Sequence, residues 1–366
     1  MPLTYTEWQR QRGAPVESTP VMFSPGDRAA AADQEGTWWA GAPHLLHVAA
    51  GCKGHATPIL HALKQIEGEL PVPGNGSTRQ LWEFFASVAA LDLVAARTLE
   101  PHFDAAAILH QAAMPWLPAT TWGVFAAEAP GQRLEANRFS GQWTLTGIKP
   151  WCSLAGELTH ALISAHTSQG RQLFMIELGG PETELADSSW VSRGLQEVPS
   201  GSLRCMDTPA QPVGEAGWYL ERPGFAVGGV GVAACWFGGA VGLFRHLLGT
   251  ARTREPDQLA LAWLGEADRL LASGAAMLER AAELADREQL GPRQAAQTRG
   301  EIARICERMI HISGHATGPG PLALDEEHAR RVADLSIYIR QHHATRDDAA
   351  LGRMLLEDRS KEQEPW

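Results

Sequence analysis

A stretch of twenty residues without a charged side chain, Phe225 to Phe244, limits what this chain can fold into. It reads FAVGGVGVAACWFGGAVGLF and contains six glycines. Such a helix is long enough to cross a bilayer, but a helix buried on all sides in a water-soluble protein has the same composition. Arg222 and Arg245 flank it on both sides, so the charges indicate no orientation in a membrane. The chain has no other such segment, and we therefore interpret this one as a buried helix rather than a membrane span.

The composition narrows the class of function. The chain has 366 residues, 42 of them acidic and 31 basic, with a formal net charge of -11. A general nucleic-acid binder needs basic surface to displace counterions, so this balance argues against nucleic acid as a partner. Five cysteines lie far apart without a CxxC pair, which favours a reducing compartment over a disulfide framework. The N-terminal stretch MPLTYTEWQRQRGAP lacks the apolar core of a secretory signal, so we expect a cytoplasmic protein.

The pattern of apolar residues changes class twice along the chain. Residues 79–112 repeat apolar side chains at three- and four-residue steps, which predicts helix. Residues 119–220 hold alternating runs such as QWTLTG, HALISAH and QLFMIEL, separated by Gly, Pro, Asp and Ser, as is typical of a compact β unit. After Pro223 the helical pattern returns, and we expect Asp325 to cap a last helix that runs to about Leu356. The sequence thus predicts an α+β fold with an N-terminal α-helical domain (1–118), a middle β-barrel domain (119–221) and a C-terminal helical bundle (222–366).

Histidines are the first candidates for chemistry. His311 and His315 stand four residues apart, a spacing that holds zinc only with further ligands, and we expect no metal here. Because Gly314 precedes His315, a polar lining at a helix end is the better interpretation. His343 lies four residues before Asp347 in QHHATRDD, where the two could form a base with its orienting partner. On spacing alone, a solvated helix face explains this second pair equally well.

The segment GIKPWCSLAGE, Gly147 to Glu157, follows a strand-like run. In an extended strand, Trp151 and Ser153 would lie on one side, with a flat apolar ring next to a hydroxyl. Such a pair suits a planar heterocycle with a hydrogen-bonding edge. Cys152 would point to the other side, into packing. From these residues alone, a core position for Trp151 is the favoured interpretation.

Three segments resemble the acyl-CoA dehydrogenase family of flavoproteins. They are GQWTLTGIKPWCSLAGELTHALISA in the β region, LWEFFASVAALDLVAARTLEPHFDA before it, and RICERMIHISGHATG near the C-terminus. KPWCS is their most specific part, and the resemblance extends from about Pro71 to Gly352. It implies a helical domain, a small β-barrel and a helical bundle, with FAD between barrel and bundle in a homodimer or homotetramer. It also implies an electron-transfer or reductase partner.

The resemblance further implies which residues bind the cofactor. Trp151 would flank the isoalloxazine ring, with Cys152 beside it, and Ser153 would hydrogen-bond the flavin near N5. Arg252 would meet the FAD pyrophosphate. His311, Gly314 and His315 match the helix end that, in the family, contacts the cofactor from a neighbouring subunit. The backbone of a strand over TTWGVFAAE would contact the flavin ring, which adds Trp122, Gly123, Val124, Phe125 and Ala127, the last in place of the family's Thr.

The sequence departs from the family at the residue that abstracts the proton. The usual catalytic glutamate is replaced by Ile339, which accepts no proton, and flavin monooxygenases of the same fold also lack that glutamate. His343 with Asp347 is then the candidate catalytic pair. The leading prediction is an FAD-dependent oxidoreductase that acts on an acyl thioester or a related small molecule. The alternatives are a flavin-dependent monooxygenase that receives reduced flavin from a partner reductase, and a non-catalytic member that binds a carrier protein.

Overall fold

The computed structural model describes residues 19–24, 38–186, 190–253 and 255–357, so the N-terminal stretch tested for a signal lies outside this part. The first described helices are α3 (Ala42–Gly51), α4 (Thr57–Lys64), α5 (Thr78–Leu91) and α6 (Leu93–Gln111). The strands are β1 (Trp122–Phe125), β2 (Leu134–Phe139), β3 (Gln142–Lys149), β4 (His160–Thr167), β5 (Gly170–Glu177), β6 (Thr183–Leu185) and β7 (Leu203–Val213). The later helices are α7 (Trp218–Glu221), α8 (Gly224–Thr253), α9 (Gln258–Asp286), α10 (Pro292–Thr317), α11 (Pro319–Leu324), α12 (Glu326–Tyr338), the 3-10 turn η3 (Ile339–Gln341) and α13 (Thr345–Glu357).

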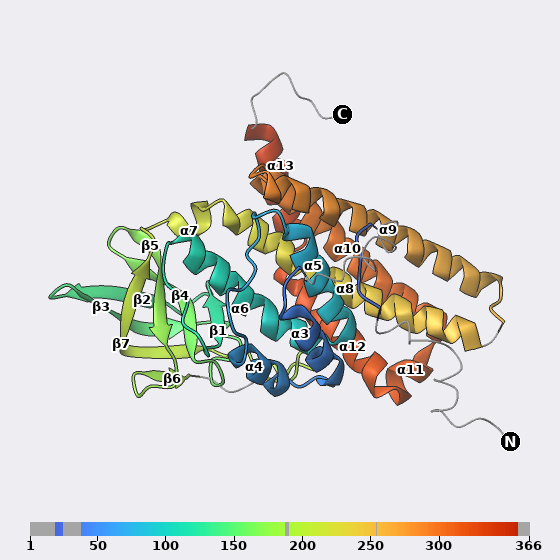
Figure 1. The fold of residues 1–366 in the computed structure, drawn as a ribbon, viewed down its shortest axis with the longest axis horizontal. Helices are drawn as coiled ribbons and strands as arrows, with labels where there is room; N and C mark the ends of the chain where they lie inside the picture. Colours follow the sequence, from blue (N-terminus) through green and yellow to red (C-terminus); the bar gives the residue numbers. More distant parts are fainter. Residues whose placement is uncertain (1–18, 25–37, 187–189, 254, 358–366) are drawn as a thin grey trace.

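The helix–strand–helix order confirms the predicted fold class, while the three domain boundaries stay predictions. Figure 1 shows the strands gathered at one end of the molecule and the long helices α8, α9 and α10 at the other, with α6 between them. The sheet runs in the order β4–β2–β3–β7–β5 and closes on itself because β5 also pairs with β4. β1 is added in parallel to β4, so it carries its residues to the side of the barrel that faces α6.

One residue divides the helix that the periodicity predicts over 79–112. The backbone of Asp92 is extended (φ -152°, ψ 122°), so α5 ends before it and α6 begins after it. One oxygen of the buried Asp92 carboxylate accepts the Ala95 N–H at 2.9 Å as an N-cap, and the other accepts the Gly54 N–H at 2.7 Å. The prediction of one continuous helix is wrong here, because this carboxylate satisfies backbone groups that a break would leave unpaired.

The uncharged segment is part of α8, which packs against α5, α6, α9, α10 and α12 in the interior of the helical part. Within the described residues it is the one helix long and apolar enough to cross a membrane, and most of its apolar part is buried. Its glycines allow close approach: a Cβ at Gly238 would lie 2.1 Å from the carbonyl oxygen of Ala86 in α5. These contacts support the interpretation as a buried core helix.

The C-terminal helix is capped as expected but is not continuous. The Asp325 carboxylate accepts the His328 N–H at 3.1 Å at the start of α12. The chain then passes through η3 and a short connection before α13 begins at Thr345. The prediction of one helix from Asp325 to about Leu356 is therefore wrong over residues 339–344, and His343 lies in this connection rather than on a helix.

Candidate functional site

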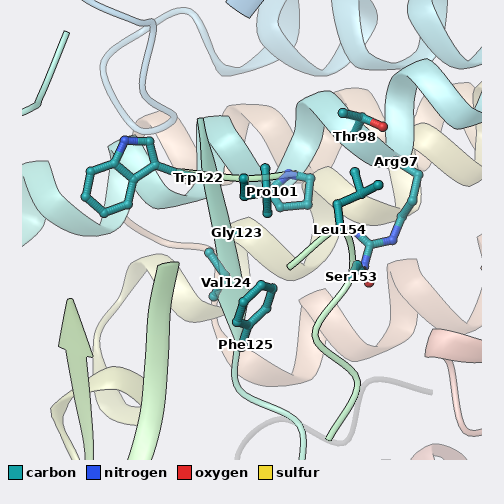
Figure 2. Close-up of a pocket in the computed structure, with 10 residues that line it drawn as sticks. Arg97, Thr98, Pro101, Trp122, Gly123, Val124, Phe125, Ser153 and Leu154 are labelled. Atoms are coloured by element: carbon teal, nitrogen blue, oxygen red, sulfur yellow. The ribbon is translucent and has the colours of Figure 1, made fainter. Parts of the chain in front are cut away.

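A pocket opens where α6, β1 and the loop after β3 meet (Figure 2). α6 brings a charged and a polar side chain to it, while β1 and the loop bring mostly apolar ones. Its lining consists of Arg97, Thr98 and Pro101 from α6, Trp122, Gly123, Val124 and Phe125 from β1, and Ser153, Leu154 and Leu158 after β3. The structure thus brings the sequence-predicted residues of β1 together with Ser153. Ala127, Trp151 and Cys152 are close in sequence to this lining but are not part of it.

The loop from Pro150 to Leu154 has an unusual backbone. Trp151 and Leu154 have positive φ values of 61° and 58°, which bulky side chains rarely adopt. The backbone of the 195–203 segment fixes this shape, because the Cys152 N–H donates to the Gly201 carbonyl at 2.8 Å. Strain that neighbouring contacts hold in place in this way is often found at functional sites.

This shape corrects one expectation. Trp151 and Ser153 do not share a face of a strand, because β3 ends at Lys149 and the backbone turns at Trp151. The Trp151 side chain is 58% exposed, whereas Ser153 is buried. Trp151 is therefore no core residue, although that was the favoured interpretation from the residues alone. Cys152 is buried with its thiol 3.3 Å from the Lys149 carbonyl oxygen, which agrees with packing.

Arg97 links α6 to the loop. Its Nη2 donates to Ser153 Oγ at 2.8 Å, and that hydroxyl also lies 2.7 Å from Ser200 Oγ. Figure 2 shows the Arg97 side chain reaching from α6 to Ser153. The same guanidinium lies over the Tyr338 ring, with Cζ 5.8 Å from the ring centroid. A cation and a hydroxyl thus stand together at a pocket whose other walls are mostly apolar.

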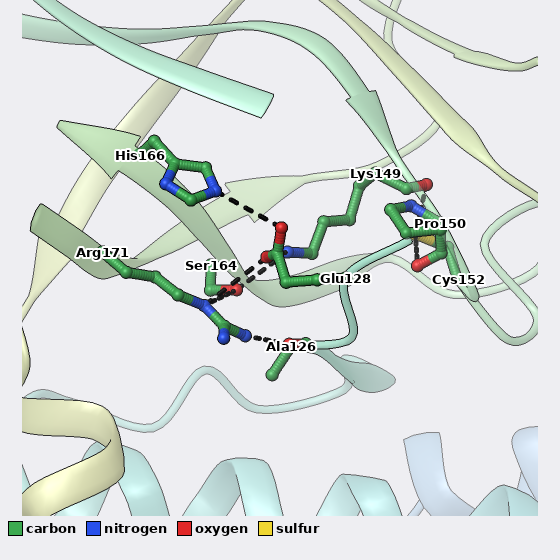
Figure 3. Close-up of polar contacts among 8 residues, drawn as sticks. All are labelled: Ala126, Glu128, Lys149, Pro150, Cys152, Ser164, His166 and Arg171. Atoms are coloured by element: carbon green, nitrogen blue, oxygen red, sulfur yellow. Dashed lines mark hydrogen bonds and ion pairs between the residues drawn. The ribbon is translucent and has the colours of Figure 1, made fainter. Parts of the chain in front are cut away.

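A polar cluster, which we call the anchor cluster, joins the end of β1 to the barrel (Figure 3). Its members are Glu128, Lys149, Ser164, His166 and Arg171. The Lys149 ammonium is buried and donates to Glu128 at 2.7 Å and to Ser164 at 2.8 Å. His166 Nε2 lies 3.3 Å from Glu128, and Arg171 Nε donates to Ser164 at 3.0 Å. The cluster therefore fixes the chain at Glu128, directly after Ala127, and at Lys149, directly before the Pro150–Leu154 loop.

Burial and the charges of the anchor cluster shift the pKa values of Glu128 and Lys149. Burial opposes ionisation of Glu128, but the hydrogen bond and charge of Lys149 outweigh it, so the pKa of Glu128 lies below its ordinary value. Burial also lowers the pKa of Lys149, against the opposing effect of Glu128. The pair is a buried ammonium held by a half-exposed carboxylate, an arrangement suited to positioning rather than to proton transfer.

A second set of charged side chains lies on one face of α6, since Arg97, Glu100 and Asp104 follow each other at three- and four-residue steps. Burial raises the pKa of Glu100 to about 8, with a further contribution from the charge of Asp104. Burial also raises the pKa of Asp104, although Arg222 lies 3.5 Å away and opposes the shift. Glu100 is therefore mostly neutral at pH 7, next to a pocket that displays the cation of Arg97.

The structure brings His343 and Asp347 together. The His343 N–H donates to Asp347 Oδ2 at 3.0 Å, and its ring Nδ1 lies 3.5 Å from Asp347 Oδ1. The His343 side chain is 57% exposed, and neither residue belongs to the lining of the pocket between α6 and β1. His342, by contrast, is nearly buried, with Nε2 3.7 Å from Asp347 Oδ2, and burial lowers its pKa. Ile339 is buried.

A second pocket lies between the end of α8, the start of α9 and the end of α10. Ala251, Trp263, Ala316 and Thr317 are among its lining residues. Three other predicted cofactor residues are adjacent to this lining, because Arg252 follows Ala251 while Gly314 and His315 precede Ala316. The fourth, His311, has its ring 4.0 Å from that of His315. The predicted cofactor residues thus form two groups, one that includes lining residues of the first pocket and one that neighbours the lining of the second in sequence.

Several solved flavin-protein structures superpose on this chain. TdsC from Paenibacillus sp. A11-2, solved with FMN, matches with a TM-score of 0.73 at 15% identity over 87% of this chain and 97% of that chain. Butyryl-CoA dehydrogenase from Megasphaera elsdenii matches with a TM-score of 0.72 at 15% identity, over 87% and 99% of the two chains. KijD3, in complex with FMN and a dTDP-linked amino-keto sugar, matches with a TM-score of 0.70 at 16% identity, over 91% and 94%.

The chain has the acyl-CoA dehydrogenase fold. No protein-family model and no curated protein matches the sequence, so at this low identity the likeness establishes the fold alone. The fold expected from the KPWCS segment and its flanks is confirmed.

Within the acyl-CoA dehydrogenase fold, sequence reasoning missed the contribution of α6. Arg97, Glu100 and Asp104 are the charged residues of a largely apolar helix, and of the three Arg97 alone touches the predicted flavin contact Ser153. Their spacing on a single face was the available signal. A stripe of charges in a helix that the apolar pattern places in the core indicates a polar interior site.

Proposed function

We propose that this protein is a flavin-dependent oxidoreductase whose flavin ring binds in the pocket between α6, β1 and the Pro150–Leu154 loop. The Arg97–Ser153 contact carries the proposal, because it places a cation and a hydroxyl at an otherwise mostly apolar pocket. A flavin ring offers the matching shape, a flat apolar body with a hydrogen-bonding edge. The fold is one in which FMN is bound by other proteins, such as TdsC and KijD3.

The residues of the pocket have distinct roles in this proposal. Trp151 is exposed on a fixed loop and is free to cover one face of a flat ring. Ser153 and the backbone of Gly123 to Phe125 would form hydrogen bonds with the polar edge of the flavin ring. Arg97 would stabilise negative charge that develops on this edge of the ring. When bound, the flavin would supply two-electron transfer, which protein side chains lack.

FAD rather than FMN is our proposal for the cofactor. The second pocket supports it, since Arg252 and His315 are direct sequence neighbours of Ala251 and Ala316, which line this separate cavity, and Gly314 precedes His315. In a homodimer or homotetramer, a neighbouring copy could bring these residues to the nucleotide end of the FAD. The proposed substrate is an acyl thioester or a related small molecule, and His343 with Asp347 is the proposed acid–base pair. A cytoplasmic location likewise remains a prediction.

A flavin-dependent monooxygenase is the second candidate. Ile339 at the usual glutamate position favours it, and the neighbour TdsC is described as a dibenzothiophene monooxygenase. Anaerobic mixing separates the two candidates: a dehydrogenase is bleached by its own substrate, whereas a monooxygenase needs a reductase with NADH.

Flavin binding itself tests the shared part of the proposal. Apo protein is titrated with FAD and with FMN, and the flavin fluorescence is followed. We expect saturable binding with a tightly bound yellow chromophore. Absence of saturable binding of either flavin would contradict the proposal and leave the third alternative, a non-catalytic partner of a carrier protein.

A further inference from the structure

The interior behind the pocket holds a buried carboxyl that is close to a cation but not bonded to it. Glu100 follows Arg97 by three residues on the same face of α6, and only 7% of its surface is exposed. Yet the hydrogen bond of the Arg97 guanidinium goes to Ser153. Among the hydrogen bonds and ion pairs of the described residues, none joins Arg97 to Glu100. This choice of partner requires an explanation, because a buried carboxylate normally takes the nearest cation.

Protonation of Glu100 explains the choice. As a neutral carboxyl it exerts little attraction on Arg97, so the guanidinium remains on Ser153. The pKa of Glu100 agrees with this state at neutral pH, since burial raises it to about 8. The groups that face Glu100 from the surrounding elements are Arg97 and Asp104 on α6, Tyr219 on α7, Cys235 on α8, Arg299 on α10 and Tyr338 on α12. Arg222, directly after α7, faces Asp104.

Two poorly paired polar atoms lie in the same interior. Among the described residues, the buried Trp236 indole nitrogen has no hydrogen-bond partner, and the buried Tyr338 hydroxyl has only the weak contact of the Cys235 thiol. The rings of these two residues are 6.4 Å apart, and the Arg97 guanidinium lies over the first of them. Of these two groups only the Tyr338 hydroxyl can accept a hydrogen bond from a guanidinium, since the indole N–H is a donor. Together with Glu100 it offers the Arg97 guanidinium a second polar position.

Arg97 is the cation free to respond when Glu100 ionises. Arg299, the other nearby guanidinium, donates to the carbonyl of Gly229 and stacks on Trp236 with Cζ 4.9 Å from the ring centroid. Arg97 has a single hydrogen bond, to a serine hydroxyl at the pocket. A carboxylate at low dielectric attracts a guanidinium far more strongly than a hydroxyl does.

We propose that Glu100 is a positioning residue, which as a neutral carboxyl leaves Arg97 on Ser153 and as a carboxylate draws Arg97 away from the pocket. The site would then bind an electron-rich or anionic ring edge tightly on the acid side and weakly on the alkaline side. This inference rests on the proposed function, because the ring in question is the flavin.

The test is a titration of apo protein with FMN between pH 6 and about 9.5, a range that spans the raised pKa. In the wild type we expect the affinity for FMN to fall about tenfold as the pH rises and Glu100 ionises. This factor corresponds to the loss of one charge-assisted hydrogen bond between Arg97 and the flavin. Glu100→Gln, which is always neutral, should keep the acid-side affinity throughout. Glu67→Gln, an exposed carboxyl removed as a matched control, should follow the wild type. The titration of FMN itself is common to all three proteins and cancels in the comparison.

An identical fall in wild type and Glu100→Gln overturns the inference. If circular dichroism shows that Glu100→Gln does not fold, Arg97→Gln takes its place and should bind FMN weakly at every pH, at the alkaline level of the wild type. A fall with pH in Arg97→Gln like that of the wild type overturns the inference as well. If the wild type does not bind FMN, the same titrations are made with FAD. Absence of binding of both flavins by the wild type at any pH contradicts the proposed function instead, so the two failures are distinguishable.

Discussion

At the scale of single residues, the pocket depends on one buried ammonium. Lys149 donates to Glu128 and Ser164, and it directly precedes the loop that carries Trp151 and Ser153. Lys149 therefore connects the end of β1 to the loop that forms another wall of the pocket. This is a structural role, and it makes a prediction about stability.

Lys149→Met should lower the free energy of unfolding by about 2 kcal/mol, because Glu128 and Ser164 each lose a buried donor while the aliphatic packing is kept. Urea unfolding at pH 7 measures the change. Glu135→Gln, which removes an exposed ion pair with Arg133, is the control and should change stability by less than about 0.5 kcal/mol. A Lys149→Met protein as stable as the control would show that the anchor cluster does not hold the fold together.

At this scale, local motifs pointed to residues that lie together in the structure. Ser153 was predicted from KPWCS and the residues of β1 from TTWGVFAAE, and both line one pocket, while their contact with a flavin stays a prediction. Arg97 was missed because its contact with Ser153 spans 56 positions of sequence, and no local pattern encodes such a pairing. The exposure of Trp151 was also unpredictable, since it follows from a positive φ that the sequence does not mark with glycine.

At the scale of elements, the glycines of α8 determine how closely its neighbours pack. A Cβ at Gly238 would meet the backbone of α5, whereas a Cβ at Gly249 in the same helix would have nothing within 4 Å. The two positions form a matched pair, with the same helix, the same substitution and opposite surroundings.

Gly238→Ala should cost about 3 kcal/mol, because α8 and α5 must separate. Gly249→Ala should instead stabilise the protein by about 0.8 kcal/mol, since alanine is the better helix former. Thermal or urea unfolding of both variants gives the comparison. Equal effects in the two variants would be incompatible with α8 as a tightly packed core helix.

Apolar periodicity predicted where helices and strands occur but not where helices break. α5 and α6 together follow the expected apolar pattern, yet Asp92 separates them because its carboxylate bonds two backbone N–H groups, one of them from the distant Gly54. Likewise, η3 interrupts the C-terminal helix without a proline or glycine at the break. Such breaks depend on tertiary contacts, which a pattern along the chain does not contain.

At the scale of the whole molecule, the proposal of FAD as cofactor assigns the two ends of the molecule to two separate pockets. In this proposal the pocket at Ser153 holds the ring. Arg252, which follows Ala251 of the second pocket in sequence, would meet the pyrophosphate of a neighbouring copy's cofactor. FMN would need the first pocket alone.

Arg252→Ala should therefore weaken FAD binding by about tenfold and leave FMN binding unchanged. The tenfold factor corresponds to the loss of one charged hydrogen bond. Arg280→Ala removes an exposed arginine from α9 and should change neither affinity. Fluorescence titrations with the two flavins measure the effect. An equal loss for FAD and FMN, or no loss for either, would exclude the second pocket as a site for the nucleotide end of FAD.

The central claim is that a flavin ring binds at the Pro150–Leu154 loop, and Trp151 allows a direct measurement. Its side chain is 58% exposed, so Trp151→Ala should leave the free energy of unfolding within about 0.5 kcal/mol of the wild type. Phe139→Ala, at the tip of the β2–β3 hairpin and 83% exposed, is the matched control. In an equilibrium titration with flavin, Trp151→Ala should bind about tenfold more weakly than Phe139→Ala, because one face of the ring loses its aromatic cover. Equal flavin affinities in the two variants would contradict the proposed site.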